Sequence, residues 1–293
     1  MSVIFIVINL AFALLFAPIV DGFERKIRAR LQNRQGPSIL QTWWDLIKLF
    51  KRPTIEPQDS VKSLYKLAPY VTFTAVLTAY LMVPTLLPSS INFVGDFIVV
   101  VYLIGLATLS FVIGAFSSGN AYAQIGSNRE VSLFMSEELL LAFIVGIIAL
   151  VGKSLSFERL FPLPLRISSA LALILLFLVI YVASARVPFD IAEAEPEIIE
   201  GPLIEYSGKH LGLLEYSLFL KRVLLYSLLL NFILPAQGFI RPVCYLTGII
   251  ALSLIYSTFE AYYGRFRIDQ AVRLMKKLSA VALIVWLMAL VGW

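Results

Sequence analysis

Eight long apolar stretches follow one another along this chain, and they limit what it can fold into. They cover residues 2–20, 67–87, 97–118, 131–152, 168–185, 221–238, 242–263 and 277–293. A helix of about 20 apolar residues spans the ~30 Å hydrocarbon layer of a membrane, and only helices and closed barrels satisfy their backbone hydrogen bonds there. We therefore expect an all-α polytopic membrane protein with about eight transmembrane helices, forming a single membrane domain over residues 1–293.

The composition supports this class and weakens the main alternative for a basic protein. Hydrophobic residues make up 59% of the chain and charged residues only 15%, whereas about a quarter of the residues in soluble domains are charged. The isoelectric point near 9.2 is compatible with nucleic-acid binding. In a membrane chain, however, basic residues usually report topology, and we expect no nucleic-acid partner.

The basic residues are concentrated on one side of the expected membrane domain. The loops 21–66, 119–130, 186–222 and 264–277 hold 20 of the 24 Lys and Arg residues. The first apolar stretch has no basic residues before it, so we interpret it as a retained anchor and not as a signal peptide. By the positive-inside rule these loops are cytoplasmic, and both termini lie outside the cell membrane.

Redox centres are not expected on this chain. It has one cysteine, Cys244, and one histidine, His210, with no CxxC or HxxxH pattern. Transition-metal and iron–sulfur sites require clustered ligands of these types. Any redox cofactor is therefore expected on another chain.

The first basic loop contains an amphipathic pattern, "SILQTWWDLIKLFKRP". Leu40, Trp43, Trp44, Ile47 and Phe50 recur at helical spacing. The pattern predicts a short cytoplasmic helix in the membrane interface, with the two tryptophans at headgroup level. The alternative is a soluble helix that packs on a partner protein, and in both cases Trp43 and Trp44 are candidates for docking.

Three acidic residues lie in or beside the fourth apolar stretch, in "SNREVSLFMSEELLLAF". Glu130 and Glu137 are seven residues apart and share a helix face, with Glu138 about 100° around the helix. A carboxylate at membrane depth costs about 2.5–3.5 kcal/mol, so it calls for a functional explanation. We interpret them as a proton relay entering from the cytoplasm, with Arg129 stabilising a charged carboxylate. Solvated acids at a helix start remain the alternative, chiefly for Glu130.

The densest group of acids lies in "RVPFDIAEAEPEIIEGPLIEYSG", residues 186–208. Its six carboxylates are Asp190, Glu193, Glu195, Glu197, Glu200 and Glu205. Glu193, Glu197 and Glu200 would share a face if the segment were helical, and neighbouring like charges raise one another's pKa values toward neutral pH. The pattern fits proton exchange and an ordinary solvated acidic loop about equally.

Glu260, near the cytoplasmic end of the seventh apolar stretch, also has two interpretations. It could belong to the relay, or it could pair with Arg265 or Arg267. We favour the ion pair, because both arginines follow closely in the chain.

Three segments carry a family resemblance. Residues 24–41, 121–138 and 186–208 resemble, in order and spacing, the three cytoplasmic signature segments of the complex I membrane subunit that meets the peripheral arm. The resemblance implies that buried acids couple electron transfer in the peripheral arm to ion movement. Matched by position are Glu24, Arg25, Arg34 and Gly36, then Arg129 and Glu138, and finally Arg186, Asp190, Glu193, Glu195, Glu197 and Glu205; the match does not cover Glu130 and Glu137.

Finer details resemble the membrane-bound [NiFe] hydrogenase branch of that superfamily, including formate hydrogenlyase and sulfane-sulfur reductase complexes. Ser38, for example, stands where complex I usually has asparagine. This branch implies peripheral iron–sulfur and hydrogenase-like large subunits as partners, with the [NiFe] or related centre and iron–sulfur clusters on them. It also implies antiporter-like membrane subunits as neighbours and translocation of protons or sodium.

Three rival functions remain open. The chain could be the quinone-binding subunit of complex I, which extracted quinone would indicate. It could be a secondary ion transporter, although internal repeats, the usual sign of that class, are not evident. It could also be a passive scaffold, in which case its acids would not affect coupling.

Overall fold

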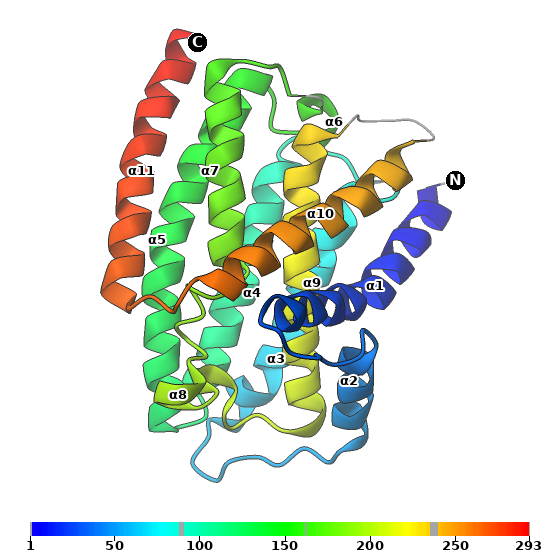
Figure 1. Cartoon of the computed structure of the whole chain (residues 1–293), viewed down its shortest axis with the longest axis vertical. Coiled ribbons are helices and arrows are strands. Elements are labelled where there is room, and N and C mark those ends of the chain that lie inside the picture. Colours follow the sequence, from blue (N-terminus) through cyan, green and yellow to red (C-terminus); the bar gives the residue numbers. More distant parts are fainter. Residues whose placement is uncertain (1, 88–90, 162, 235–239, 293) are drawn as a thin grey trace.

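The computed structural model describes residues 2–87, 91–161, 163–234 and 240–292, and every regular element in these ranges is a helix (Figure 1). The long helices are α1 (Ser2–Leu31), α3 (Lys62–Met82), α4 (Asp96–Phe116), α5 (Ala121–Gly152), α7 (Ile167–Ala183), α9 (Gly208–Ile233), α10 (Arg241–Tyr262) and α11 (Ile268–Val291). The short ones are α2 (Gln41–Lys51), α6 (Phe157–Leu160), α8 (Glu195–Ile198) and the 3₁₀ helix η1 (Gly201–Leu203). The predicted all-α class is confirmed.

Each of the eight apolar stretches overlaps one of the eight long helices. Five of these helices, α1, α4, α5, α10 and α11, are long and apolar enough to cross a membrane. Helix α7 is apolar but has 17 residues, while α3 and α9, with 21 and 26 residues, are not among these five. A polytopic membrane protein is therefore confirmed; residues 235–238 and 293, at the ends of two stretches, lie outside the described residues.

Several helices are longer than their apolar stretches, so the predicted loop boundaries are partly wrong. Helix α1 continues to Leu31, α5 begins at Ala121, and α9 begins at Gly208. Hydropathy detects only the apolar part of a helix, whereas polar extensions continue the same backbone hydrogen bonds. The start of α5 is capped by Asn120, whose side-chain oxygen accepts hydrogen bonds from two backbone N–H groups at 2.7 and 3.4 Å.

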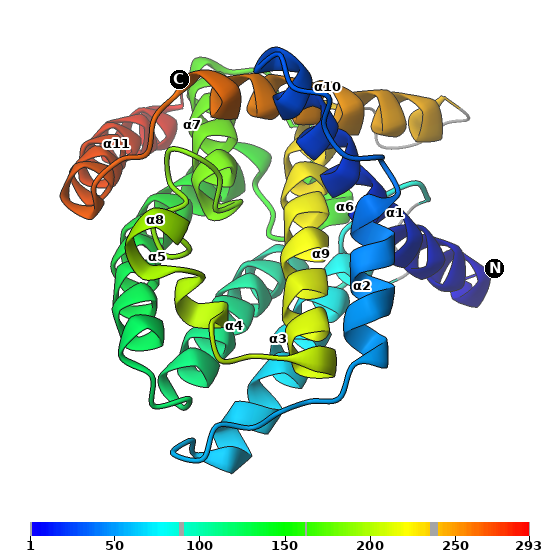
Figure 2. The same ribbon diagram turned by 60° about the horizontal axis from the view of Figure 1, so that its bottom comes forward.

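The long helices form one bundle around a shared apolar core. Helices α4, α5, α7, α9 and α11 run along the long axis of the molecule, while α1 and α10 lie side by side and cross them obliquely (Figures 1 and 2). Helix α2 lies alongside one end of α9 with a similar axis. The predicted short helix is therefore present; its position at a membrane interface stays a prediction.

Residues 186–208, which we call the acidic segment, fold onto the same end of the bundle as α2. Its α8 and η1 pack on α5 (Figure 2). Close approach requires glycine at two positions, because a Cβ on Gly126 would lie 2.8 Å from the carbonyl oxygen of Ala192, and one on Gly201 would lie 2.1 Å from it. Gly201 also has a φ of +50°, which favours glycine. These glycines bring the acidic segment against the helices.

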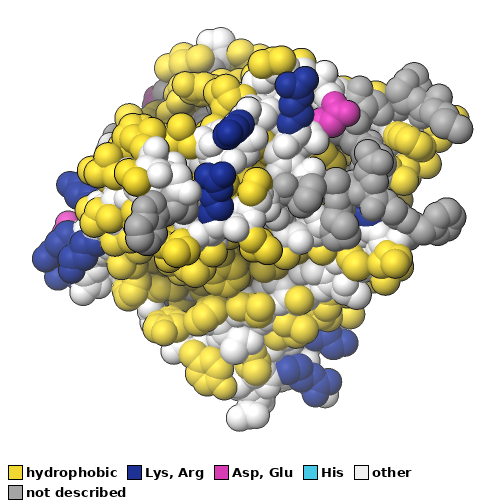
Figure 3. Space-filling view, turned by 90° about the horizontal axis from the view of Figure 1, so that it is seen from above, with side chains coloured by type: hydrophobic (Ala, Val, Ile, Leu, Met, Phe, Trp, Pro, Cys, Tyr) yellow, Lys and Arg dark blue, Asp and Glu magenta, His cyan; other side chains and the backbone are white. Residues whose placement is uncertain are grey.

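The opposite end of the bundle, which carries α6, has few charges. Viewed onto this end, several separate Lys and Arg side chains lie among hydrophobic and uncharged atoms, with an Asp or Glu side chain near one of them (Figure 3). The basic residues assigned from the sequence to the outer side are Lys153, Arg159, Arg166 and Arg241.

Candidate ion-coupling site

A buried arginine connects the loop after α7 to two helices. The Arg186 guanidinium, 2% exposed, forms ion pairs with Glu24 of α1 and, at 3.2 Å, with Glu260 of α10. The hydroxyl of Tyr226 on α9 donates a hydrogen bond to Glu24 at 3.0 Å. Burial alone would lower the pKa of Arg186, but the charges of Glu24 and Glu260 outweigh it and raise that pKa. Arg186 is therefore a permanent cation.

Two further arginines complete this group. Arg222 of α9 lies 2.7 Å from a carboxylate oxygen of Asp21 and 3.3 Å from one of Glu24. Arg28 of α1 pairs with Glu260. We call Asp21, Glu24, Arg28, Arg186, Arg222 and Glu260 the arginine–carboxylate cluster. Its three cations and three anions balance, which compensates for burying them.

The cluster includes only part of the predicted first signature. Glu24 lies in it as a predicted charge partner, whereas Arg25 is half exposed and lies at its edge, 4.0 Å from Asp21 and 3.9 Å from Asp45 of α2. Arg34 is exposed, and its guanidinium donates a hydrogen bond to the side chain of Gln32. The interpretation of Glu260 as a partner of Arg265 or Arg267 is wrong, because the fold brings Arg28 and Arg186 to it instead.

The acidic segment does not present one charged face. Helix α8 has only four residues, so it begins after Glu193 and ends before Glu200. Asp190 lies 2.8 Å from Arg265, Glu197 lies 2.6 Å from Arg129, and Glu205 accepts a hydrogen bond from Asn120 at 2.6 Å. The segment is therefore not one helix, and the condition under which Glu193, Glu197 and Glu200 would share a face is not met.

The remaining carboxylates of that segment differ in their surroundings. Glu200 is exposed, and the side chain of Glu195 lies outside the described residues. Glu193 is half buried and lines a cavity of about 40 Å³ together with Glu130, Asp190, Lys221 and Arg222. Burial, with added repulsion from Asp190 and Glu130, raises the pKa of Glu193 to about 8, against the opposing charge of Arg222. The pKa of Glu193 therefore lies near neutral pH.

Three further acids lie on α5, beginning at this cavity and continuing into the bundle. Glu130 also lines a second cavity of about 20 Å³, whose polar lining comes from Thr72, Thr108, Ser217 and Lys221. Glu137 is buried one heptad further along, about 10 Å along the helix axis, and Glu138 lies beside Gly105 of α4. We call Glu130, Glu137 and Glu138 the α5 glutamates. Both cavities have room for water, which bridges gaps too long for a direct hydrogen bond.

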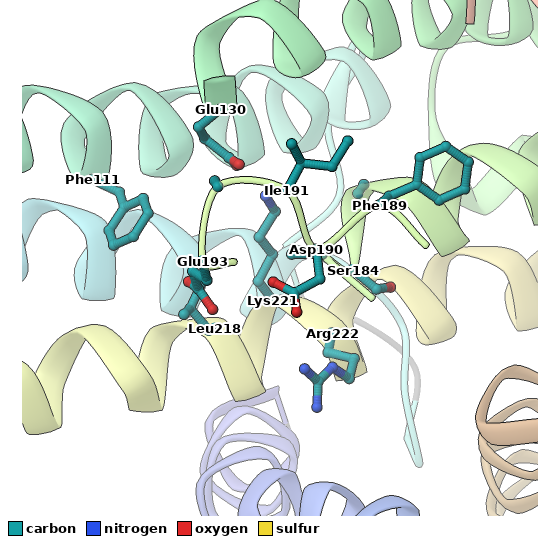
Figure 4. Close-up of a pocket in the computed structure, with 13 residues that line it drawn as sticks. Phe111, Glu130, Ser184, Phe189, Asp190, Ile191, Glu193, Leu218, Lys221 and Arg222 are labelled. Carbon is teal, nitrogen blue, oxygen red and sulfur yellow. The ribbon is translucent and has the colours of Figure 1, made fainter. Parts of the chain in front are cut away.

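Arg129 does not compensate the α5 glutamates. It forms its ion pair with Glu197 and donates a further hydrogen bond to the carbonyl of Ile191 at 3.4 Å. The cation that faces these acids is Lys221 of α9, which the sequence interpretation missed. In Figure 4, Lys221 and Glu130 point toward one another, while Arg222 points away toward α1. The signal was present as two adjacent basic residues in an apolar helix, but the expected boundary put them at a loop edge.

The two tryptophans of α2 have different environments. Trp43 turns inward, where its indole N–H donates to the carbonyl of Leu15 at 3.3 Å and its ring lies 6.3 Å from that of Tyr216. Trp44 is 56% exposed, and Leu40 and Ile47 are exposed beside it. Trp44 is therefore the more accessible of the two tryptophans to a partner or to lipid.

Metal ligands do not gather in the described part of the chain, where no group of three or more His, Cys, Asp or Glu side chains could hold a metal ion. The charged groups instead form ion pairs or line small cavities. Their arrangement is suited to holding and passing protons or small cations.

Comparisons with known proteins agree over nearly the whole chain. A family model described as NADH dehydrogenase matches residues 3–291. Formate hydrogenlyase subunit 4 of Escherichia coli (strain K12) is 31% identical over 285 residues, covering 92% of each chain. Hydrogenase-4 component C of the same organism is 33% identical over 263 residues, covering 86% of this chain and 82% of the relative.

A solved structure has the same fold. A chain of the membrane-bound sulfane sulfur reductase, an archaeal respiratory membrane complex, superposes with a TM-score of 0.88 at 26% identity. The match covers 98% of this chain and 99% of the other.

Proposed function

The chain belongs to the family described as NADH dehydrogenase, and we propose that it is the membrane-anchor and coupling subunit of a respiratory oxidoreductase complex of the [NiFe] hydrogenase type. It docks a cytoplasmic redox module and links electron transfer there to translocation of protons or sodium. It acts as a subunit of an enzyme complex, without a redox centre of its own. The relatives named formate hydrogenlyase and hydrogenase-4 support this branch.

One observation carries the coupling role. Glu130 and Lys221 line both cavities, one beneath the acidic segment and one between α3, α4 and α9. Glu193 is the first of a series of acids that starts at the end of the bundle that carries α2. The α5 glutamates continue this series into the bundle. A rearrangement of the acidic segment would therefore change the charge around Glu130 and so its affinity for a proton.

Docking is supported by the end of the bundle that carries α2. A groove of about 370 Å³ between α2 and α9 is lined by charged side chains. These are Arg25, Asp45, Lys48, Arg52 and Glu215. Together with exposed Trp44, this mixed lining suits a polar protein surface with an apolar anchor. We assign this groove to peripheral iron–sulfur and hydrogenase-like large subunits.

The electron carriers belong to those partners in this proposal. The whole chain has one cysteine and one histidine, too few for an iron–sulfur cluster or a [NiFe] centre. We place both kinds of centre on partner subunits, and antiporter-like subunits beside this chain in the cell membrane. The basic loops face the cytoplasm and both termini face outside.

The rival function within the family is the quinone-binding subunit of complex I. This rival is supported by the description of the matching family model, NADH dehydrogenase. Quinone that co-purifies with the complex, and inhibition by quinone-site blockers, would support this rival. A complex containing a hydrogenase-like large subunit and no bound quinone would support the proposal.

The coupling role is tested with Glu130→Gln, which removes the titratable proton and keeps nearly the same shape. In the complex reconstituted into vesicles, we expect the ion gradient per electron to fall at least severalfold while dye-linked activity of the peripheral module persists. Glu200→Gln, at an exposed carboxylate of the acidic segment, is the matched control. An unchanged gradient per electron in Glu130→Gln vesicles would contradict the proposal.

A further inference from the structure

Lys221 is a buried cation without an ion pair among the described residues. Its side chain is 8% exposed, and its ammonium donates a hydrogen bond to the hydroxyl of Thr108 at 2.9 Å. The adjacent Arg222 points the other way, into the arginine–carboxylate cluster (Figure 4). Burying an ammonium this way is costly. The position of Lys221 therefore requires an explanation beyond packing.

The cavity around this ammonium offers oxygen acceptors. Three hydroxyls line it, from Thr72, Thr108 and Ser217. Each already donates its hydrogen to a helix carbonyl, at 3.4, 3.2 and 2.6 Å respectively. A hydroxyl has one hydrogen to donate, so these oxygens retain only acceptor capacity. Such oxygens interact with a donor or a cation.

Glu130 completes this lining with a carboxylate. Hydroxyl and carboxylate oxygens are the ligands that small hard cations prefer. The cavity, at about 20 Å³, has room for one water-sized particle. Without Lys221, these groups would resemble a binding site for dehydrated sodium.

We propose that Lys221 determines the ion specificity of the relay, because its tethered ammonium takes the position of a sodium ion and leaves the path to protons. This inference rests on the proposed coupling function. The ammonium donates a hydrogen bond to the Thr108 hydroxyl, which uses one of the oxygens that sodium would need. It also interacts electrostatically with all three α5 glutamates. A second cation in the same small cavity would meet that charge at low dielectric.

A proton avoids this obstacle because it binds covalently to a carboxylate oxygen. Glu130 takes up one proton to become a carboxylic acid and returns to a carboxylate when the proton passes to the next acceptor. This step needs no coordination shell and no added volume. Sodium requires several oxygens at once, and one of them already holds the ammonium.

The test measures sodium binding by the purified full-length chain through its unfolding temperature, in NaCl and in choline chloride at equal ionic strength. Wild type should show no sodium-specific shift. Lys221→Ser empties the position of the ammonium, so its unfolding temperature should rise with the logarithm of sodium concentration. Lys221→Arg keeps the charge and should behave like wild type, and Lys221→Ser/Glu130→Gln should lose the response.

Either of two results overturns the inference. One is a sodium-specific stabilisation of wild type that Glu130→Gln abolishes; the other is a folded Lys221→Ser or Lys221→Gln variant that ignores sodium. If neither Lys221→Ser nor Lys221→Gln folds, the inference is decided by the response of the wild-type unfolding temperature to sodium. This binding assay is independent of the vesicle gradient, so the specificity of Lys221 and the coupling role of Glu130 can fail separately.

Discussion

Arg186 forms an ion pair with Glu24 although neither side chain is more than 3% exposed. The pair joins the acidic segment, which follows α7, to α1. The two residues are 162 positions apart in the chain. The segment is therefore held at a fixed position relative to the helices that carry the other acids.

Removing one partner of this pair should destabilise the chain strongly. Glu24→Gln or Arg186→Met leaves an incompletely compensated buried charge, which typically costs about 3–5 kcal/mol. The double variant should lose less than the sum of the single losses, because contacting residues are not additive. Unfolding of the purified chain by denaturant measures all three. Additive losses would show that the pair has no direct coupling.

The exposed pair should matter far less. Arg129 and Glu197 lie 2.6 Å apart, but their side chains are 25% and 60% exposed. Solvent screens such a pair, so Arg129→Gln should change the free energy of unfolding by less than about 1 kcal/mol. The same denaturation experiment provides the comparison. A loss comparable to that of Arg186→Met would contradict this ranking.

Glu193 should make stability depend on pH. Its pKa is about 8 in the fold and 4.5 as the ordinary value, so the folded chain binds more protons between these pH values than the unfolded chain does. The contribution of Glu193 to the free energy of unfolding is then fully present below pH 4.5 and is lost as the pH rises toward 8. We expect Glu193→Gln to flatten this slope in thermal unfolding profiles. Glu200→Gln is the control, and an unchanged slope in Glu193→Gln would refute the assignment.

Trp44 should contribute to docking without contributing to the fold. Trp44→Glu places a charge on the exposed face of α2 and should reduce the amount of peripheral module retained after detergent purification. Val94→Glu changes a residue that is 88% exposed outside the docking end and is the control. Trp43→Glu should instead destabilise the chain, because Trp43 packs inward. Retention at wild-type stoichiometry in Trp44→Glu would argue against docking at α2.

Glu138 tests how far the relay extends. Glu138→Gln should preserve assembly and lower the gradient per electron more than the dye-linked activity, since it removes a titratable group at membrane depth. Glu158→Gln, at an exposed acid in α6, is the matched control. If Glu138→Gln gives the same ion gradient per electron as the control Glu158→Gln, Glu138 is not part of the relay.

The predicted interface helix shows how far sequence patterns reach. The spacing of Leu40, Trp43, Trp44 and Ile47 correctly predicted α2. It could not assign the two tryptophans, because a helix wheel does not say which neighbours a helix meets. Packing against α1 and α9 turned Trp43 inward and left Trp44 outside.

By itself, the sequence determined the helical class, the number of apolar stretches and the loops that carry most of the basic residues, because burial in lipid depends on the composition of each stretch. Only the tertiary structure decided which charges meet. It brought Arg28 to Glu260, 232 residues away, and aimed the neighbours Lys221 and Arg222 at different acids. Ion pairs act over a few ångströms, so they depend on how helices pack and not on their order in the chain.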